Sequence, residues 1–143
     1  MVGRRPTVLL FDIDGTLVLT GGAGRRAMDR GFATVVGRPD ACDGFSLAGM
    51  TDRAIVRCGL RAVAADDSEA TIDGVLAAYL AALAEELARA SGYVVLPGVV
   101  ELLAFVTQQA NVAVGLGTGN LRHGARLKLS HGNLWEPFAF GGF

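Results

Sequence analysis

Three short apolar runs lie at the two ends of the sequence. Thr7 to Phe11 is apolar at four of its five positions and leads straight into two aspartates, and Val112 to Leu116 ends in a glycine-rich turn. Continuous apolar runs of this length are typical of strands in parallel sheets, which are covered on both faces. A third strand is expected near Phe138 to Phe140. The pattern predicts an α/β fold built on a parallel sheet.

The segment between the first two strands has helical periodicity. Arg25 to Val36 predicts one helix, and Thr51 is a suitable N-cap for a second helix that continues to about Leu60. The strongest pattern follows, with apolar residues on a single helical face. This face consists of Ile72, Val75, Leu76, Tyr79, Leu80, Leu83 and Leu87. We interpret it as ordinary helix packing.

Two further helices are expected beside the second strand. One is expected to begin at Pro97, which suits the first position of a helix, and to continue through Val99 to Val106. The other covers Leu121 to Gly132, where glycine ends it. The segments divide the chain into a discontinuous α/β core, residues 1–17 and 93–143, and an inserted helical cap, residues 18–92.

Composition narrows the class of protein. The 143 residues have a net charge of −1, which gives no indication of nucleic acid or an anionic membrane as a partner. The apolar runs are too short for a membrane span or a signal peptide, so we expect a cytoplasmic protein. Cys42 and Cys58 are far apart and are expected to be free thiols. Neither His123 nor His131 has the spacing of a metal ligand.

Polar residues follow both strands where the strands end. Asp12 and Asp14 are two positions apart, so both side chains can lie on one side of the chain while Ile13 points into the core. Thr118 and Asn120 follow the second strand, and an ordinary helix N-cap there remains an alternative. If the strands are parallel, these four residues converge at the carboxyl edge of the sheet, where ligands bind in open α/β folds.

The segment "FDIDGTL" resembles the first motif of the haloacid dehalogenase-like hydrolases, and "VGLGTGN" resembles their second motif. The segment between them resembles the helical cap of phosphoglycolate phosphatase-like and β-phosphoglucomutase-like members. The resemblance covers essentially the whole chain and implies a Rossmann-like core with this inserted cap.

The resemblance assigns chemical roles to the two aspartates. Asp12 would be the nucleophile that forms an aspartyl-phosphate, and Asp14 would be the general acid and then the general base. The Asp12 carboxylate and the Asp14 backbone carbonyl would hold Mg²⁺, which prefers oxygen ligands. The cation would offset the repulsion between two neighbouring carboxylates and a phosphate.

The resemblance also implies a phosphate site. Thr118 and the backbone amides of Gly119 and Asn120 would bind the phosphate at the start of a helix. Lys128, the only lysine in the sequence, would be the lysine of the third motif. A helix that began near Asn120 would put Lys128 about 12 Å along its axis, which leaves open whether the side chain reaches the site.

The sequence departs from the family pattern after the third strand. It ends at Phe143, before the pair of acids that forms the fourth motif, and Glu136 is the only acid after Thr118. We therefore expect a core that is incomplete at the C-terminus and binds Mg²⁺ weakly. We also expect exposed apolar residues and self-association through them. These residues are Trp135, Phe138, Phe140 and Phe143.

The resulting functional hypothesis is a Mg²⁺-dependent phosphatase that acts on a small phosphorylated metabolite. A β-phosphoglucomutase-like phosphomutase is the enzymatic alternative, because an aspartyl-phosphate can also return its phosphoryl group to a sugar. Dehalogenation is disfavoured, since it needs neither Asp14 nor a metal. A phosphate-binding or interaction module without turnover is the non-enzymatic alternative. The sequence does not identify the substrate.

Overall fold

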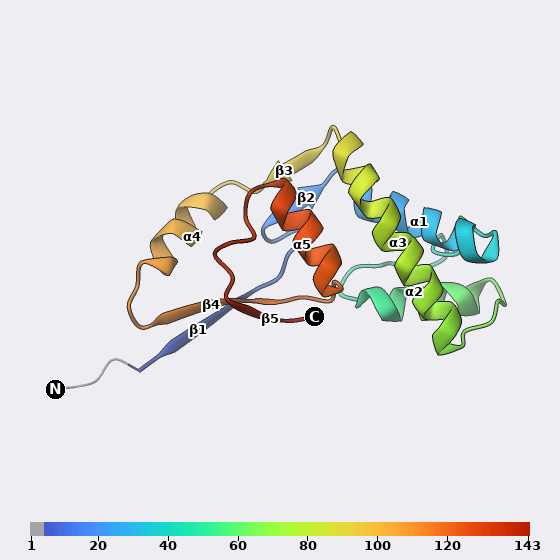
Figure 1. The fold of residues 1–143 in the computed structure, drawn as a ribbon, viewed down its shortest axis with the longest axis horizontal. Helices are drawn as coiled ribbons and strands as arrows, with labels where there is room; N and C mark the ends of the chain where they lie inside the picture. Colours follow the sequence, from blue (N-terminus) through green and yellow to red (C-terminus); the bar gives the residue numbers. More distant parts are fainter. Residues whose placement is uncertain (1–4) are drawn as a thin grey trace.

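The computed structural model describes residues 5–143, so Met1 to Arg4, which belong to the predicted core segment and to the N-terminus considered as a signal peptide, lie outside it. A parallel sheet in the order β1-β4-β5 forms one end of the molecule (Figure 1). Its strands are β1 (Thr7–Phe11), β4 (Val112–Gly117) and β5 (Phe140–Gly142). The register pairs Thr7 with Val112 and Phe11 with Leu116. The α/β fold and the parallel arrangement are confirmed.

Two helices flank the central strand in sequence. They are α4 (Val99–Thr107) and α5 (Arg122–His131). Both bury apolar side chains in one cluster with β1 and β4, including Leu103, Val114, Leu116 and Leu129. This cluster is the core of the sheet region.

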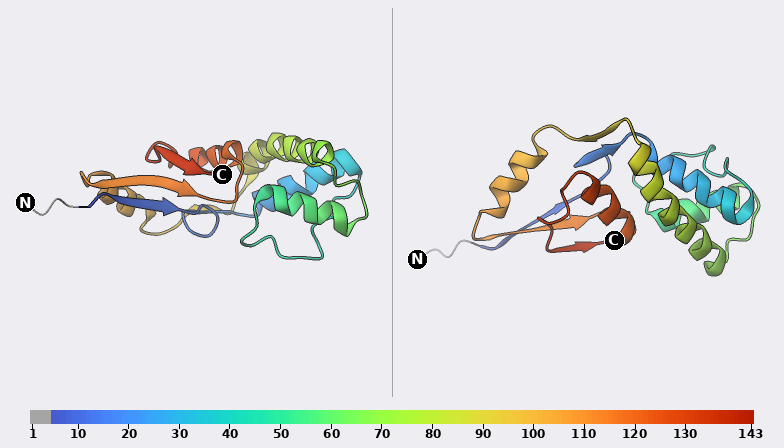
Figure 2. Two further views of the ribbon diagram at one scale, coloured as in Figure 1. Left: turned by 90° about the horizontal axis from the view of Figure 1, so that it is seen from below. Right: turned by 45° about the horizontal axis from the view of Figure 1, so that its top comes forward.

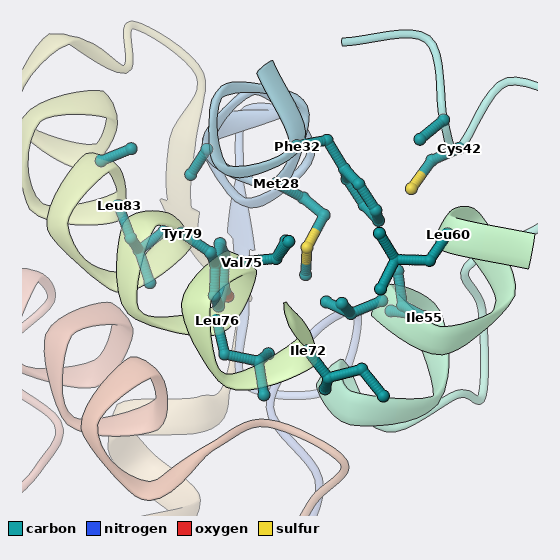
Figure 3. Packing of buried hydrophobic residues seen from close by; sticks show 14 of the residues in the cluster. Met28, Phe32, Cys42, Ile55, Leu60, Ile72, Val75, Leu76, Tyr79 and Leu83 are labelled. Carbon is teal, nitrogen blue, oxygen red and sulfur yellow. The ribbon is translucent and has the colours of Figure 1, made fainter. Parts of the chain in front are cut away.

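Three helices form the opposite end of the molecule (Figures 1 and 2). They are α1 (Ala23–Val36), α2 (Asp52–Ala62) and α3 (Glu69–Arg89). A second hydrophobic cluster holds them together, and Figure 3 shows its side chains meeting from all three helices. Phe32 of α1 and Leu60 of α2 are fully buried in it, as is Val75 of α3. That residues 18–92 form a separate cap domain remains our proposal.

The helices begin and end for identifiable reasons. Thr51 caps α2, as predicted, because its hydroxyl accepts a hydrogen bond from the Ala54 amide at 3.2 Å. Ser68 caps α3 in the same way. The predicted apolar face of α3 is buried, with Leu80 half-buried at its edge. Gly31 lets α1 approach α3, since a side chain there would lie 3.0 Å from the Val75 carbonyl oxygen.

Two short strands connect the two ends of the molecule. β2 (Val18–Thr20) pairs antiparallel with β3 (Tyr93–Val95), so the chain enters and leaves the three-helix region at one place. Gly21 and Gly92 lie back to back beside these strands. A Cβ atom at Gly21 would be 2.6 Å from the Gly92 carbonyl carbon, so the contact requires glycine.

Several details differ from the sequence prediction. The β1 strand is not buried on both faces: Val8 and Leu10 are 59% and 61% exposed, because no segment of residues 5–143 covers that face over them. Phe138 is buried rather than exposed, since its ring packs edge-on against Phe11 with centroids 6.1 Å apart. Trp135 is half-buried, whereas Phe140 and Phe143 are exposed as expected.

Three element boundaries also differ. The last strand begins at Phe140, two residues later than the expected start, and Phe138 instead belongs to the hydrophobic cluster of the sheet region. Helix α4 begins at Val99 with Gly98 as its N-cap, so Pro97 precedes the helix instead of starting it. Helix α5 begins at Arg122, after Leu121.

The remaining predictions concern thiols and the membrane. Cys42 and Cys58 are both free, the first buried and the second half-buried. Within residues 5–143, every helix is too short or too polar to cross a lipid bilayer.

Candidate active site

The carboxyl ends of β1 and β4 place two polar segments side by side. Asp12 and Asp14 follow β1, and Thr118 to Asn120 follow β4; all line one cavity. Ile13 is fully buried between the aspartates, as the alternation predicts. Gly15 then turns the chain with a φ of 78°, and its amide donates to the Val18 carbonyl at 2.9 Å. A tight turn therefore holds both carboxylates at the edge of the sheet.

Asp14 is held by two side chains. The Lys128 ammonium group lies 2.9 Å from each of its carboxylate oxygens, and the Asn120 amide donates to Oδ2 at 2.8 Å. Lys128 also donates to Asn120 Oδ1 at 2.6 Å, and Asn120 donates to the Thr118 hydroxyl at 2.8 Å. The network fixes the orientation of the Asp14 carboxylate relative to the loop after β4.

Lys128 reaches the site, which the sequence left open. Helix α5 begins at Arg122, two residues after the start near Asn120 that the sequence suggested, so Lys128 is closer to the helix N-terminus. Side chains on a helix also lean back toward its N-terminus. Lys128 is only 4% exposed, so its stem is buried beside the ion pair. Gly24 of α1 lies beside it: a Cβ atom there would be in ordinary van der Waals contact with the ammonium nitrogen, at 3.5 Å.

Asp12 differs from Asp14 in its surroundings. It is exposed, and its carboxylate makes no hydrogen bond or ion pair with any other residue between 5 and 143. Lys128 contacts Asp14 instead. An unpaired carboxylate on the cavity wall is available to attack an electrophile or to bind a cation.

The three-helix region closes the other side of the cavity, whose volume is about 730 Å³. Met28, Leu47 and Ile55 give this wall an apolar character, and Arg25 lies among them. The Arg25 guanidinium is already paired with Asp29 at 2.9 Å and Asp43 at 2.6 Å. The site therefore lies between the sheet and the helices.

Asp52 and Tyr79 were not predicted as site residues. Tyr79 was predicted as a packing position on a helix, and Asp52 directly follows the predicted N-cap Thr51. Tyr79 is 1% exposed in the hydrophobic cluster, and it lines the cavity together with Asp52. Nothing in the local sequence around either residue distinguishes it from packing or capping.

Asp52 connects α2 directly to the loop after β4. Its backbone amide donates to the Gly119 carbonyl at 2.8 Å, and its Oδ2 accepts from the Leu121 amide at 2.8 Å. The residue is 7% exposed, and desolvation raises the pKa of its carboxyl, partly opposed by the Leu121 amide. Gly119 is also close to the backbone just before α2, because a Cβ atom at Gly119 would be 2.7 Å from the Met50 carbonyl oxygen.

Comparison with known families identifies this arrangement. A family model described as haloacid dehalogenase-like hydrolase matches residues 9–138, which include all the polar residues at the two strand ends. The chain belongs to the haloacid dehalogenase-like hydrolase family. Comparison with curated protein sequences gives no significant match.

Solved structures show the same fold as this haloacid dehalogenase-like chain. CbbY from Rhodobacter sphaeroides, in complex with phosphate, has a TM-score of 0.70 and 21% identity, over 96% of this chain and 63% of that one. A protein described as a predicted phosphoglycolate phosphatase from Haemophilus somnus 129pt has a TM-score of 0.64 and 13% identity, over 99% and 63%. The HAD-hydrolase YfnB from Bacillus subtilis, bound to magnesium, has a TM-score of 0.51 and 18% identity, over 96% and 65%. The chain thus spans less than two thirds of the length of each of these structures.

The oxygen atoms that could bind a divalent cation lie at the end of β1. Among residues 5–143, no group of three or more histidine, cysteine or acidic side chains could hold a metal ion. The unpaired Asp12 carboxylate and the Asp14 carbonyl are oxygen donors, which fit Mg²⁺ in type. Both carboxylate oxygens of Asp14 accept hydrogen bonds from Lys128, and Oδ2 also accepts one from Asn120. The site therefore offers the right donor atoms but few of them.

Proposed function

We propose that this haloacid dehalogenase-like chain is a Mg²⁺-dependent phosphatase that hydrolyses a small phosphorylated metabolite through an aspartyl-phosphate on Asp12. The observation that carries the proposal is the contrast between two neighbouring carboxylates. Asp12 is unpaired and faces the cavity, while Asp14 is fixed by Lys128 and Asn120. A nucleophile needs a free lone pair, whereas an acid–base group needs a defined orientation.

The residues supply each step of such a reaction. The Asp12 carboxylate attacks phosphorus, the bond from phosphorus to the ester oxygen breaks, and protonated Asp14 gives its proton to the departing oxygen. Water then loses a proton to Asp14 and attacks phosphorus, which releases inorganic phosphate and restores Asp12. Thr118 and the Gly119 amide would bind the phosphoryl oxygens, and the Asn120 amide would join them by releasing its 3.2 Å hydrogen bond to the Thr118 hydroxyl.

Magnesium would be held by the Asp12 carboxylate and the Asp14 carbonyl, with water and phosphate oxygens as the remaining ligands. When bound, it would shield the charge between Asp12 and the phosphate. Lys128 would orient the ionised Asp14, because its ammonium contacts both carboxylate oxygens; the oxygen that carries the proton would give up its contact.

Phosphate release from a panel of small phosphate esters, with and without Mg²⁺, tests the proposal. We expect Mg²⁺-dependent turnover that Asp12→Asn abolishes and that Asp14→Asn lowers by roughly 10²–10⁴-fold. Transfer of the phosphoryl group to a sugar phosphate instead of water would indicate a mutase. Binding of phosphate without turnover of any ester would contradict enzymatic activity for this chain.

A further inference from the structure

Tyr79 presents an unused hydrogen-bonding group to the cavity. Its ring is packed among the helices, and Figure 3 shows the side chain extending from α3 with its oxygen at the tip. The hydroxyl has no hydrogen-bond partner within the described part of the chain. No side-chain nitrogen or oxygen that is sealed from solvent there lacks a partner, so this hydroxyl is not sealed from solvent, and Tyr79 lines the cavity.

The second group is one oxygen of Asp52. Its Oδ2 accepts from the Leu121 amide, whereas Oδ1 makes no hydrogen bond with residues 5–143. Asp52 is 7% exposed and lines the same cavity, so the oxygen left over faces the ligand space. Tyr79 lines this cavity too, and its pKa is raised first by burial and then by the charges of Asp52 and Asp14.

The two groups are complementary in hydrogen bonding. The Tyr79 hydroxyl keeps its proton and can donate it, since burial raises its pKa well above the ordinary value. Asp52 Oδ1 can only accept when the carboxylate is ionised. An alcohol hydroxyl satisfies both at once, because it accepts one hydrogen bond and donates another.

The charges around the cavity argue against a second anionic group on the ligand. Arg25 and Lys128 are the cationic residues that line it, and each already pairs with acids. A ligand carboxylate near Asp52 would meet a like charge, and the two cations that line the cavity within residues 5–143 are already paired.

We propose that Tyr79 and Asp52 form a recognition site for a neutral hydroxyl group on the carbon chain of the substrate, next to its phosphate. Tyr79 donates to this hydroxyl and Asp52 accepts from it. The substrate class is therefore a hydroxylated phosphate monoester rather than a carboxylated one. The inference rests on the proposed function, because it assumes that the phosphate lies at Asp12 and Thr118.

Binding of three non-hydrolysable phosphonates tests the proposal without requiring turnover. Ethylphosphonate, 2-hydroxyethylphosphonate and phosphonoacetate differ in the group attached to the same short chain. Their dissociation constants are measured by calorimetry in the presence of Mg²⁺, with inorganic phosphate as the reference ligand. We expect the hydroxylated compound to bind roughly two- to tenfold more tightly than ethylphosphonate, as one neutral hydrogen bond provides. Phosphonoacetate should bind no more tightly than ethylphosphonate.

Two tyrosine variants separate this site from general packing. Tyr79→Phe keeps the buried ring and removes the hydroxyl, so the preference for 2-hydroxyethylphosphonate over ethylphosphonate should fall to about one. Tyr93→Phe is the matched control: its hydroxyl donates to the Lys128 carbonyl at 2.7 Å, outside the cavity, and the preference should remain.

A third variant tests Asp52 separately. In Asp52→Asn, the amide oxygen can still accept from Leu121, which turns the NH₂ group toward the cavity. We expect the preference to shift from the hydroxylated ligand toward phosphonoacetate.

The outcomes distinguish two failures. If the wild-type protein binds the phosphonates without preference, or Tyr79→Phe keeps the preference, the hydroxyl site is wrong although phosphate binding stands. If neither inorganic phosphate nor any phosphonate binds, the proposed function fails and this inference fails with it. Circular dichroism of each variant shows that the fold is retained.

Discussion

The ammonium group of Lys128 lies 2.9 Å from both carboxylate oxygens of Asp14, across 114 positions of sequence. We expect Lys128→Met to lower the free energy of unfolding by about 1–3 kcal/mol, because charge-assisted hydrogen bonds to Asp14 and Asn120 are lost. Phosphate affinity should fall as well, because Asn120 Oδ1 loses the hydrogen bond that Lys128 donates to it. Urea denaturation and phosphate titration measure the two effects. Arg126→Met, an exposed cation on the same helix, should change neither.

Asp12→Asn should abolish covalent phosphorylation while leaving the fold intact. The substitution keeps the shape of an exposed side chain and removes the charge that attacks phosphorus. Mass spectrometry after incubation with acetyl phosphate detects the adduct in the wild-type protein. An adduct of equal yield in the variant would assign the nucleophile to another residue.

Gly119→Ala should weaken phosphate binding. The new Cβ would be 2.7 Å from the Met50 carbonyl oxygen and 2.9 Å from the Thr51 Cα, so the loop after β4 must move. We expect a cost of about 1–3 kcal/mol in unfolding free energy and a clear loss of phosphate affinity. Gly44→Ala is the control, since a Cβ there meets nothing within 4 Å. Equal phosphate affinity in both variants would show that the loop position does not matter.

Magnesium affinity should depend on Asp12 and not on Glu136. Glu136 is exposed and does not line the cavity, so Glu136→Gln should leave the affinity unchanged, whereas Asp12→Asn should lower it. Two protein oxygen donors make a weak site for an ion that favours octahedral coordination. We therefore expect binding to tighten when phosphate is present to supply further oxygens. Calorimetry with and without phosphate measures this, and loss of Mg²⁺ binding in Glu136→Gln would contradict it.

Stability should decrease at alkaline pH because of Cys42. Burial raises the pKa of this thiol from 9.0 to about 11, so the folded protein holds a proton that the unfolded chain releases. The contribution is fully present below pH 9 and is lost as the pH rises toward 11, at about 1.4 kcal/mol per pH unit. Urea denaturation at pH 8 and pH 10.5 measures the slope. In Cys42→Ala this part of the slope should disappear; an unchanged slope would assign it to other groups.

The sequence predicted the elements whose signal is local. Thr51 as an N-cap and the apolar face containing Ile72 both follow from spacing within a few residues, and the structure confirms them. The meeting of the two strand ends followed from one further assumption, that the strands are parallel.

The rest depended on contacts between distant segments. Whether Lys128 reaches Asp14 depends on where α5 begins and on how the helix is placed relative to the end of β1, neither of which a motif records. Tyr79 has the same spacing as its neighbours on α3, and only the fold shows that its tip opens onto the cavity. The exposed face of β1 was missed for a related reason, since an apolar run does not reveal which neighbours cover it.

The contact between Gly21 and Gly92 has a consequence for how such a chain can change over time. The 70 or so residues between them begin and end at almost the same point, because β2 and β3 run side by side. A segment with adjacent ends can be exchanged, lengthened or deleted without moving the strands that carry Asp12 and Thr118. The proposed phosphate site and the three helices that face it can therefore be inherited as separate modules, with the chain passing between them only at β2 and β3.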